Sequence, residues 1–174
     1  MIKISEAKNE DAEKIVEIGR KTFIETYSRE NTSENMEKYL NDAFNKSDIE
    51  KEINEPNSIF LLAYEYNKVM GYAKINIHKG TNNIENIEAM EIERLYILAE
   101  CFGKKVGKTL MEECLRIGKD NNCTVAWVQV WGDKYNSGLR AIEFYKKWGF
   151  EKFAKKVFIL GDSEQEDILM KKEF

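Results

Sequence analysis

The sequence predicts a single α/β domain with a mixed sheet of about seven strands, parallel in its centre and flanked by helices. Two observations support this fold class. Short apolar or alternating runs, typical of strands, are separated by stretches with helical periodicity. Near the middle of the chain a strand, a helix and another strand follow one another, and such a crossover places its two strands side by side and parallel. The length of 174 residues suits one domain, residues 1–174.

The composition is that of an ordinary globular protein. Hydrophobic residues make up 43% of the chain and charged residues 33%, and the net charge is −4. A general role in nucleic-acid binding is disfavoured, because binding to the phosphate backbone relies on basic patches. No stretch has the apolar length that spans a membrane, and the N-terminus has no apolar signal core. Three cysteines without a CxxC pair and one histidine predict neither a disulfide framework nor a metal site, and they fit a cytoplasmic location.

The first half of the chain predicts a strand, three helices and a hairpin of two strands. The helical stretches have apolar residues every three or four positions, and the last of them ends before Pro56. The expected strands are residues 2–4, 58–65 and 69–78. The expected helices are residues 11–27, 33–44 and 47–53. A short turn joins the hairpin strands, and a polar loop is expected over residues 79–86.

The second half predicts the crossover unit, another helix and the closing strands. The expected helices are residues 103–119, ended by two asparagines, and residues 139–148, ended by Gly149. A loop is expected over residues 132–136. The expected strands are residues 90–98, 124–131, 150–153, 157–160 and 167–171.

The loop that opens the crossover helix is basic and contains glycine. Its residues are Gly103, Lys104, Lys105, Val106, Gly107 and Lys108. Free backbone N–H groups and the positive end of a helix dipole favour an anion at such a position. The arrangement is typical of a phosphate-binding site, although it also fits a solvated start of a helix.

Two motifs, in order and on the expected elements, resemble those of the GNAT superfamily of acyl-CoA-dependent N-acetyltransferases. The first is the strand 93–97 (ERLYI) followed by the loop 103–110 (GKKVGKTL), which is similar to the family's pyrophosphate loop. The second is the stretch 141–150 (AIEFYKKWGF), which is similar to the family's A-x-x-F-Y-x-x-x-G-F helix and turn. The stretch 22–27 (TFIETY) and the RLYIL strand look closest to bacterial spermidine/spermine N-acetyltransferases.

The resemblance implies a GNAT-like sheet in which acetyl-CoA enters between the strands that end at Leu98 and Trp131. Pantetheine would pair with the first strand, and the basic loop would hold the pyrophosphate. The implied cofactor-binding residues are Leu95, Tyr96, Ile97, Phe102, Gly103, Lys104, Lys105, Val106, Gly107, Lys108 and Asn136. The chain departs from the family at Phe102, where Gln or Arg is usual, at Lys105, where the first glycine is usual, and at Gly138, where Asn is frequent.

Three residues are candidates for catalysis. Glu91 and Glu93 lie two apart on one strand and therefore on one face, where a carboxylate pair can raise the pKa of one member towards neutrality. Either could be the base, and both could hold a cationic substrate, or they could be a charged strand edge. Tyr145 falls on the family's tyrosine position and would protonate the departing thiolate, although it also fits an aromatic core stripe. A covalent route through Cys101 is disfavoured, because no histidine is near in sequence.

The function implied by the resemblance is acetyl-CoA-dependent transfer of an acetyl group directly to a primary amine, such as the polyamines spermidine or spermine, without a metal. Acceptor specificity is expected in the helices of residues 9–54 and in the loops. The alternatives are acetylation of a protein N-terminus or lysine, and a non-catalytic CoA-binding regulatory module. The expected partners are a small-molecule amine and acetyl-CoA, with no nucleic acid and no membrane. Exposed aromatic residues in the closing strands favour a homodimer.

Overall fold

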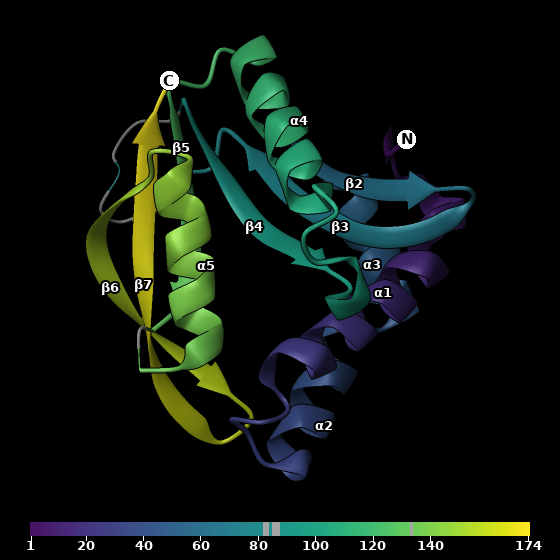
Figure 1. Ribbon diagram of the computed structural model, residues 1–174, viewed down its shortest axis with the longest axis vertical. Helices are drawn as coiled ribbons and strands as arrows, with labels where there is room; N and C mark the ends of the chain where they lie inside the picture. The colour runs from purple at the N-terminus through teal and green to yellow at the C-terminus, as the bar shows by residue number, and fades with distance from the viewer. Residues whose placement is uncertain (82–83, 85–87, 133) are drawn as a thin grey trace.

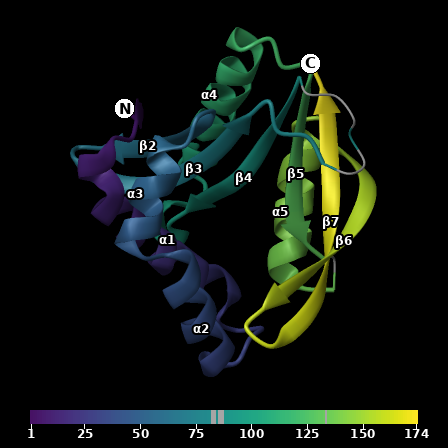
Figure 2. The ribbon, with the colours of Figure 1, turned by 180° about the vertical axis from the view of Figure 1, so that it is seen from behind.

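The structure is a mixed α/β fold built on one seven-stranded sheet, as the sequence predicts (Figures 1 and 2). The computed structural model describes residues 1–81, 84, 88–132 and 134–174. The sheet order is β1-β2-β3-β4-β5-β7-β6. The strands are β1 (Lys3–Glu6), β2 (Ser58–Glu65), β3 (Lys68–Ile77), β4 (Ala89–Ile97), β5 (Val125–Trp131), β6 (Glu151–Leu160) and β7 (Ser163–Glu173).

Helices cover both faces of the sheet. The helices are α1 (Ala12–Tyr27), α2 (Ser33–Ala43), α3 (Lys46–Asn54), α4 (Val106–Asp120) and α5 (Asn136–Lys147), with short 3-10 turns η1 (Asn9–Asp11) and η2 (Ala99–Cys101). α1 and α3 pack on one side of the β2–β4 region and α4 on the other, while α5 packs on β5 (Figures 1 and 2). None of the described helices is long and apolar enough to cross a membrane.

At the centre of the sheet, β4 and β5 are neighbours over only part of their length. β4 and β5 pair in parallel, which confirms the prediction from the strand–helix–strand crossover. They pair only at Ala89↔Val125, Met90↔Ala126 and Glu91↔Trp127. Beyond these positions the two strands diverge (Figure 1). The sheet is therefore split into one half with β1 to β4 and another with β5, β7 and β6.

Local sequence explains where the helices begin and which face they bury. Thr32 caps α2 by accepting a hydrogen bond from the N–H of Asn35, and Asn45 caps α3 through the N–H of Asp48. In α4 the apolar stripe points into the core. Its buried residues include Val106, Leu110, Met111, Cys114 and Leu115. Burial of each large side chain stabilises the fold by about 1.5–3 kcal/mol.

Several predicted boundaries are wrong. The two closing strands expected over 150–153 and 157–160 form one strand, β6, because a β-bulge near Lys152 lets its pairing with β7 continue. α4 begins at Val106 rather than at residue 103, and α5 begins at Asn136 rather than at residue 139. Of the polar loop expected over 79–86, residues 82, 83, 85 and 86 lie outside the described residues.

Candidate active site

A cleft of about 450 Å³ occupies the opening between β4 and β5. Its walls are the second half of β4, the loop before α4, the second half of β5, one face of α5 and the end of α1. The predicted cofactor-binding residues that line it are Leu95, Tyr96, Ile97, Phe102, Gly103, Lys105, Val106, Gly107 and Lys108. Lys104 and Asn136 do not line it. The N–H of Asn136 donates instead to Oε1 of Glu30, at 3.1 Å.

The edge of β4 that faces this cleft has free backbone groups. β3 pairs with β4 as far as Gly71↔Ile97, but β5 pairs with it only as far as Glu91. In a strand, N–H and C=O groups point alternately to the two sides, so the β5 side of the stretch 92–97 lacks a partner strand. An extended ligand with amide groups, such as pantetheine, fits this edge as an added strand.

The loop before α4 is shaped to receive an anion. Gly103 has φ +79° and Lys105 has φ +66°, so the chain turns twice through left-handed conformations before the helix begins. This conformation costs a residue with a side chain about 1–2 kcal/mol. The first N–H groups of α4 have no partner within the helix and carry its positive dipole end. A Cβ on Gly107 would lie 2.6 Å from Cδ1 of Ile97, so glycine lets α4 start close against β4. The loop therefore fits a pyrophosphate.

Two departures from the family pattern have structural explanations. A Cβ on Gly138 would lie 2.2 Å from the carbonyl oxygen of Gly132 and 2.5 Å from that of Trp131, so the asparagine frequent in the family has no room here. Phe102 is half-exposed at the rim of the cleft, and the guanidinium carbon of Arg140 lies 4.4 Å from its ring centroid. Arg140, which the sequence analysis did not name, thus places a guanidinium from α5 beside Phe102 at the cleft.

A second cavity, of about 220 Å³, adjoins the cleft. The two share five lining residues, which mark their junction. These are Tyr27, Glu93, Tyr96, Gln129 and Trp131. The other residues around the second cavity are Phe23, Tyr39, Phe44, Glu91, Arg94, Phe158, Leu160 and Asp167. We call this space the aromatic cavity, because rings from α1, α2, β4, β5 and β6 and the residue after α2 form most of its wall.

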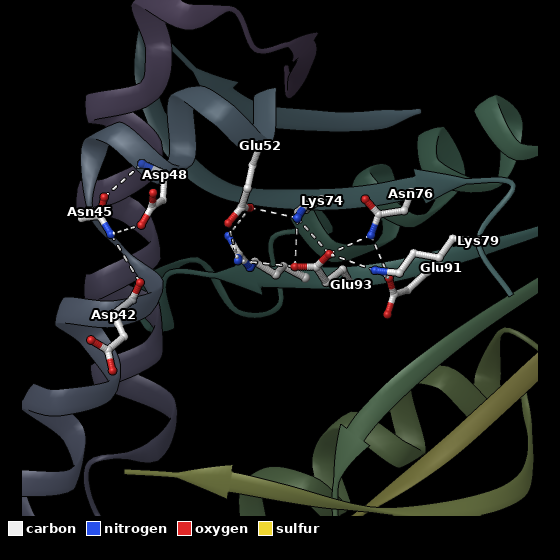
Figure 3. A network of polar contacts seen from close by, with 10 residues as sticks. Asp42, Asn45, Asp48, Glu52, Lys74, Asn76, Lys79, Glu91 and Glu93 are labelled. Atoms are coloured by element: carbon white, nitrogen blue, oxygen red, sulfur yellow. Dashed lines mark hydrogen bonds and ion pairs between the residues drawn. The ribbon is translucent and has the colours of Figure 1, made fainter. Parts of the chain in front are cut away.

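The carboxylates of Glu91 and Glu93 lie on one face of β4, as predicted, and are held by one amide. Nδ2 of Asn76 donates to Oε2 of Glu91 and to Oε2 of Glu93, each at 2.7 Å (Figure 3). Nζ of Lys79 lies 2.7 Å from Oε2 of Glu91 and 3.8 Å from Oε2 of Glu93. Both carboxylates therefore already have cationic or amide partners in the protein.

Glu93 also belongs to a charge cluster that extends to α3. Nζ of the buried Lys74 lies 2.9 Å from Oε2 of Glu93 and 2.9 Å from Oε2 of Glu52 (Figure 3). The guanidinium of Arg94 lies 3.4 Å from Glu93 and 3.2 Å from Glu52. The cluster has two cations and two carboxylates, so its charges balance.

Comparison with known proteins decides the family. Residues 13–150 match the Acetyltransferase (GNAT) family. The chain belongs to the GNAT family. It is therefore an N-acetyltransferase that uses acetyl-CoA, as the two sequence motifs implied.

Relatives of this GNAT protein cover nearly its whole length. An uncharacterized N-acetyltransferase in the pepI 3′ region of Lactobacillus delbrueckii subsp. lactis is 32% identical over 171 residues, covering 98% of this chain and 96% of that one. The spermidine N(1)-acetyltransferase of Thermoplasma acidophilum is 26% identical, covering 99% of this chain and 98% of that one. The crystal structure of PaiA N-acetyltransferase from Thermoplasma acidophilum in complex with coenzyme A has the same fold, with a TM-score of 0.81, 24% identity and coverage of 100% and 99%.

A carboxylate pair can raise the pKa of one member, as considered from the sequence, but in this GNAT site the pKa of Glu93 is lowered instead. Burial alone would raise the pKa of Glu93, but Arg94, Lys74 and the hydrogen bond from Asn76 outweigh burial and hold it below its ordinary value. Lys74 lies on β3, and Arg94 follows Glu93 on β4. The pairing of the two strands has a β-bulge between Lys74 and Ile75. Sequence spacing could show the carboxylate pair but not the cations packed against it.

Tyr145 lies on α5, where its side chain is buried and lines the cleft. Its ring packs edge-on against Phe150, with the centroids 5.3 Å apart. Burial raises the pKa of Tyr145 far above its ordinary value, so the hydroxyl stays protonated at neutral pH. The position is compatible with both predictions for Tyr145, a core aromatic and a proton donor, because the ring belongs to the core while the residue borders the cleft.

Asp167 of β7 is a site residue that the sequence analysis missed. Its side chain is 6% exposed and lines the aromatic cavity. Oδ2 accepts a hydrogen bond of 2.7 Å from Nε2 of Gln129, whereas the buried Oδ1 has no hydrogen-bond partner among the residues that the structure describes. Burial raises the pKa of Asp167 to about 6. No signal in the closing-strand sequence distinguished this carboxylate from its neighbours, because only the pairing of β7 with β5 brings it to the cavity.

Proposed function

We propose that the protein transfers the acetyl group of acetyl-CoA directly to a primary amine of a small cationic acceptor of the polyamine type. The observation that carries this proposal is the aromatic cavity next to the cleft. Its rings attract ammonium groups through their π faces, and the carboxylate of Asp167 attracts them by charge. The 26% identity to a spermidine N(1)-acetyltransferase supports the same acceptor class.

In this proposal acetyl-CoA lies along the cleft. Pantetheine pairs with the backbone of Leu95, Tyr96 and Ile97, and the pyrophosphate binds the N–H groups at the start of α4. Exposed lysines of the loop add positive charge. Arg140 and Phe102 at the rim provide a cation and a ring for the nucleotide end. The acetyl group then lies at the junction of cleft and aromatic cavity, which the two spaces share.

Transfer requires a neutral amine at the thioester carbon. Glu93 lines the junction, and its low pKa keeps it ionised, so we expect water to take the proton of the ammonium form and the carboxylate to accept a hydrogen bond from the neutral amine. The amine nitrogen bonds to the carbonyl carbon, and a backbone N–H of β4 stabilises the oxyanion. The carbon–sulfur bond then breaks, Tyr145 donates its hydroxyl proton to the CoA thiolate, and the proton that the new amide nitrogen releases restores the Tyr145 hydroxyl through solvent.

An acceptor screen tests the proposal. The release of free thiol from acetyl-CoA is measured with spermidine, spermine, putrescine, peptides with a free N-terminus and peptides containing lysine. We expect turnover with the small polycations and at least tenfold lower kcat/KM with both kinds of peptide. Preference for peptides would contradict the acceptor class. CoA binding without turnover of any acceptor would indicate a regulatory module instead.

A further inference from the structure

We propose that Asp167 is the anchor for a second, non-reacting ammonium group of the acceptor, and that the protein therefore prefers diamines and polyamines to monoamines. The inference rests on the proposed function and deepens it, because it assigns the Asp167 side of the aromatic cavity to a second charged nitrogen. It also separates the roles of three carboxylates that line the same space.

The charges of Glu91 and Glu93 are already balanced by lysines of the protein. Each has a lysine nitrogen within 2.9 Å, Lys79 at Glu91 and Lys74 at Glu93, and each accepts a hydrogen bond from Asn76. These carboxylates are largely neutralised before any substrate arrives. An added ammonium would have to compete with fixed cations of the protein.

Asp167, in contrast, has an oxygen without a partner among the described residues. No lysine or arginine of the described residues forms an ion pair with Asp167, and its Oδ1 is buried without a hydrogen-bond partner. Lys156 lies opposite Asp167 in the register of β6 and β7, and its exposed ammonium attracts the carboxylate without forming an ion pair with it. A buried carboxylate oxygen without a partner costs free energy, which an ammonium donor in the cavity would recover.

Asp167 and Glu93 line different parts of the site. Asp167 lines the aromatic cavity but not the cleft, whereas Glu93 lines both. Asp167 meets the junction through the hydrogen bond from Gln129, so we assign the reacting nitrogen to Glu93, which lines the cleft, and the second nitrogen to Asp167. A group bound there is a second positive charge of the same molecule and not the nucleophile.

The aromatic part of the cavity wall suits an alkyl chain. Tyr39 stacks on Phe23 at 4.5 Å and meets Phe158 edge-on at 5.9 Å, while Tyr27 meets Trp131 edge-on at 4.4 Å. Rings in these orientations pack against methylene groups and attract a desolvated ammonium. A diamine matches these surfaces. Its two nitrogens would lie at Glu93 and Asp167, and its methylene groups would contact the rings.

The test compares putrescine with butylamine, which has the same chain length but lacks the second nitrogen. We expect wild-type kcat/KM to be about 30-fold higher for putrescine, the effect of one charged hydrogen bond. In Asp167→Asn, which keeps the shape and an acceptor for Gln129, this ratio should fall below about threefold, chiefly through a loss of kcat/KM for putrescine. Asp167→Glu, which keeps the charge, should retain part of the preference.

The matched control is Glu164→Gln, which removes an exposed carboxylate from the same strand and should leave the ratio unchanged. Equal turnover of both amines by the wild type would overturn the inference and leave the proposed function intact. A parallel loss with both amines in Asp167→Asn would overturn it too, because it would place Asp167 at the reacting nitrogen. If no amine is acetylated, the proposed function fails. Calorimetric binding of spermidine to wild type and Asp167→Asn in the presence of CoA then tests the anchor separately.

Discussion

At the scale of single residues, Asp167 links acceptor binding to stability. Its folded pKa of about 6 lies above the ordinary value of 3.8. A carboxylic acid whose pKa is raised by folding favours the fold below its unfolded pKa, and this contribution is lost as the pH rises through the folded pKa. At neutral pH the ionised Asp167 therefore destabilises the protein.

Asp167→Asn should raise the free energy of unfolding at pH 7 by about 1–2 kcal/mol. This value is smaller than the free energy equivalent to the full pKa shift, because water in the cavity screens the charge. The gain should shrink towards zero as the pH is lowered to 4. Urea denaturation between pH 4 and 7 measures it, with Glu164→Gln as the matched variant. A variant less stable than wild type at pH 7 would contradict this account.

Tyr145 offers a second test at this scale. Tyr145→Phe keeps the ring in contact with Phe150 and removes only the proton donor. We expect kcat to fall roughly 100-fold, with KM for acetyl-CoA and thermal stability unchanged, because a general acid acts only as the thiolate leaves. Steady-state kinetics with thiol detection checks this. Retention of the full rate would mean that solvent protonates the thiolate.

At the scale of elements, the charge cluster ties α3 to the sheet. Lys74 on β3 is buried between Glu52 of α3 and Glu93 of β4. Lys74→Met leaves the carboxylates with one cation fewer, so we expect a loss of about 3 kcal/mol in the free energy of unfolding. Chemical denaturation measures it. Lys51→Met, which removes a lysine from an exposed pair on α3, should change the value by less than 1 kcal/mol.

The start of α5 depends on close contact with the end of β5. Gly138→Ala would push a Cβ against the carbonyl oxygens of Trp131 and Gly132, so we expect a loss of about 1–3 kcal/mol. Because α5 carries Tyr145 and Arg140, KM for acetyl-CoA should rise as well. The neighbouring Leu139 is half-exposed, and Leu139→Ala serves as the control. A Gly138→Ala protein of wild-type stability would show that the backbone adjusts freely here.

At the scale of the whole molecule, the two halves of the sheet are joined by few contacts. β4 and β5 pair at only three positions. The end of α1 and the segment after it add further links. Glu25 accepts a hydrogen bond from the N–H of Ala99, while Glu30 accepts from Asn136 and Ser137. The α1–α2 connection thus touches both sides of the cleft and limits how far they separate.

A ligand that binds both halves should therefore stabilise the whole protein. At 100 times its dissociation constant acetyl-CoA should add about 2.7 kcal/mol to the free energy of unfolding. Amide hydrogen exchange should slow in the stretch 92–97, whose free edge faces the cleft. Thermal unfolding and exchange with and without acetyl-CoA check both points. Protection confined to the loop before α4 would show that pantetheine does not pair with β4. The expected homodimer stays a prediction.

The sequence by itself determined the order of elements and the nature of the central unit. Period-two runs identified the strands, helical spacing identified the helices, and a crossover of one helix required parallel pairing of β4 and β5. The two motifs also located the residues around the cleft and Tyr145. These features follow from local sequence, because periodicity and turn chemistry act over neighbouring residues.

Only the tertiary structure decided the electrostatics of the aromatic cavity. Glu93 was visible from its spacing, but Lys74 and Arg94, which keep its pKa low, reach it through a β-bulge and the pairing of β3 with β4. Asp167 enters the cavity because β7 inserts between β5 and β6. A pKa depends on distance and burial, and both are set by strand register between segments far apart in the chain.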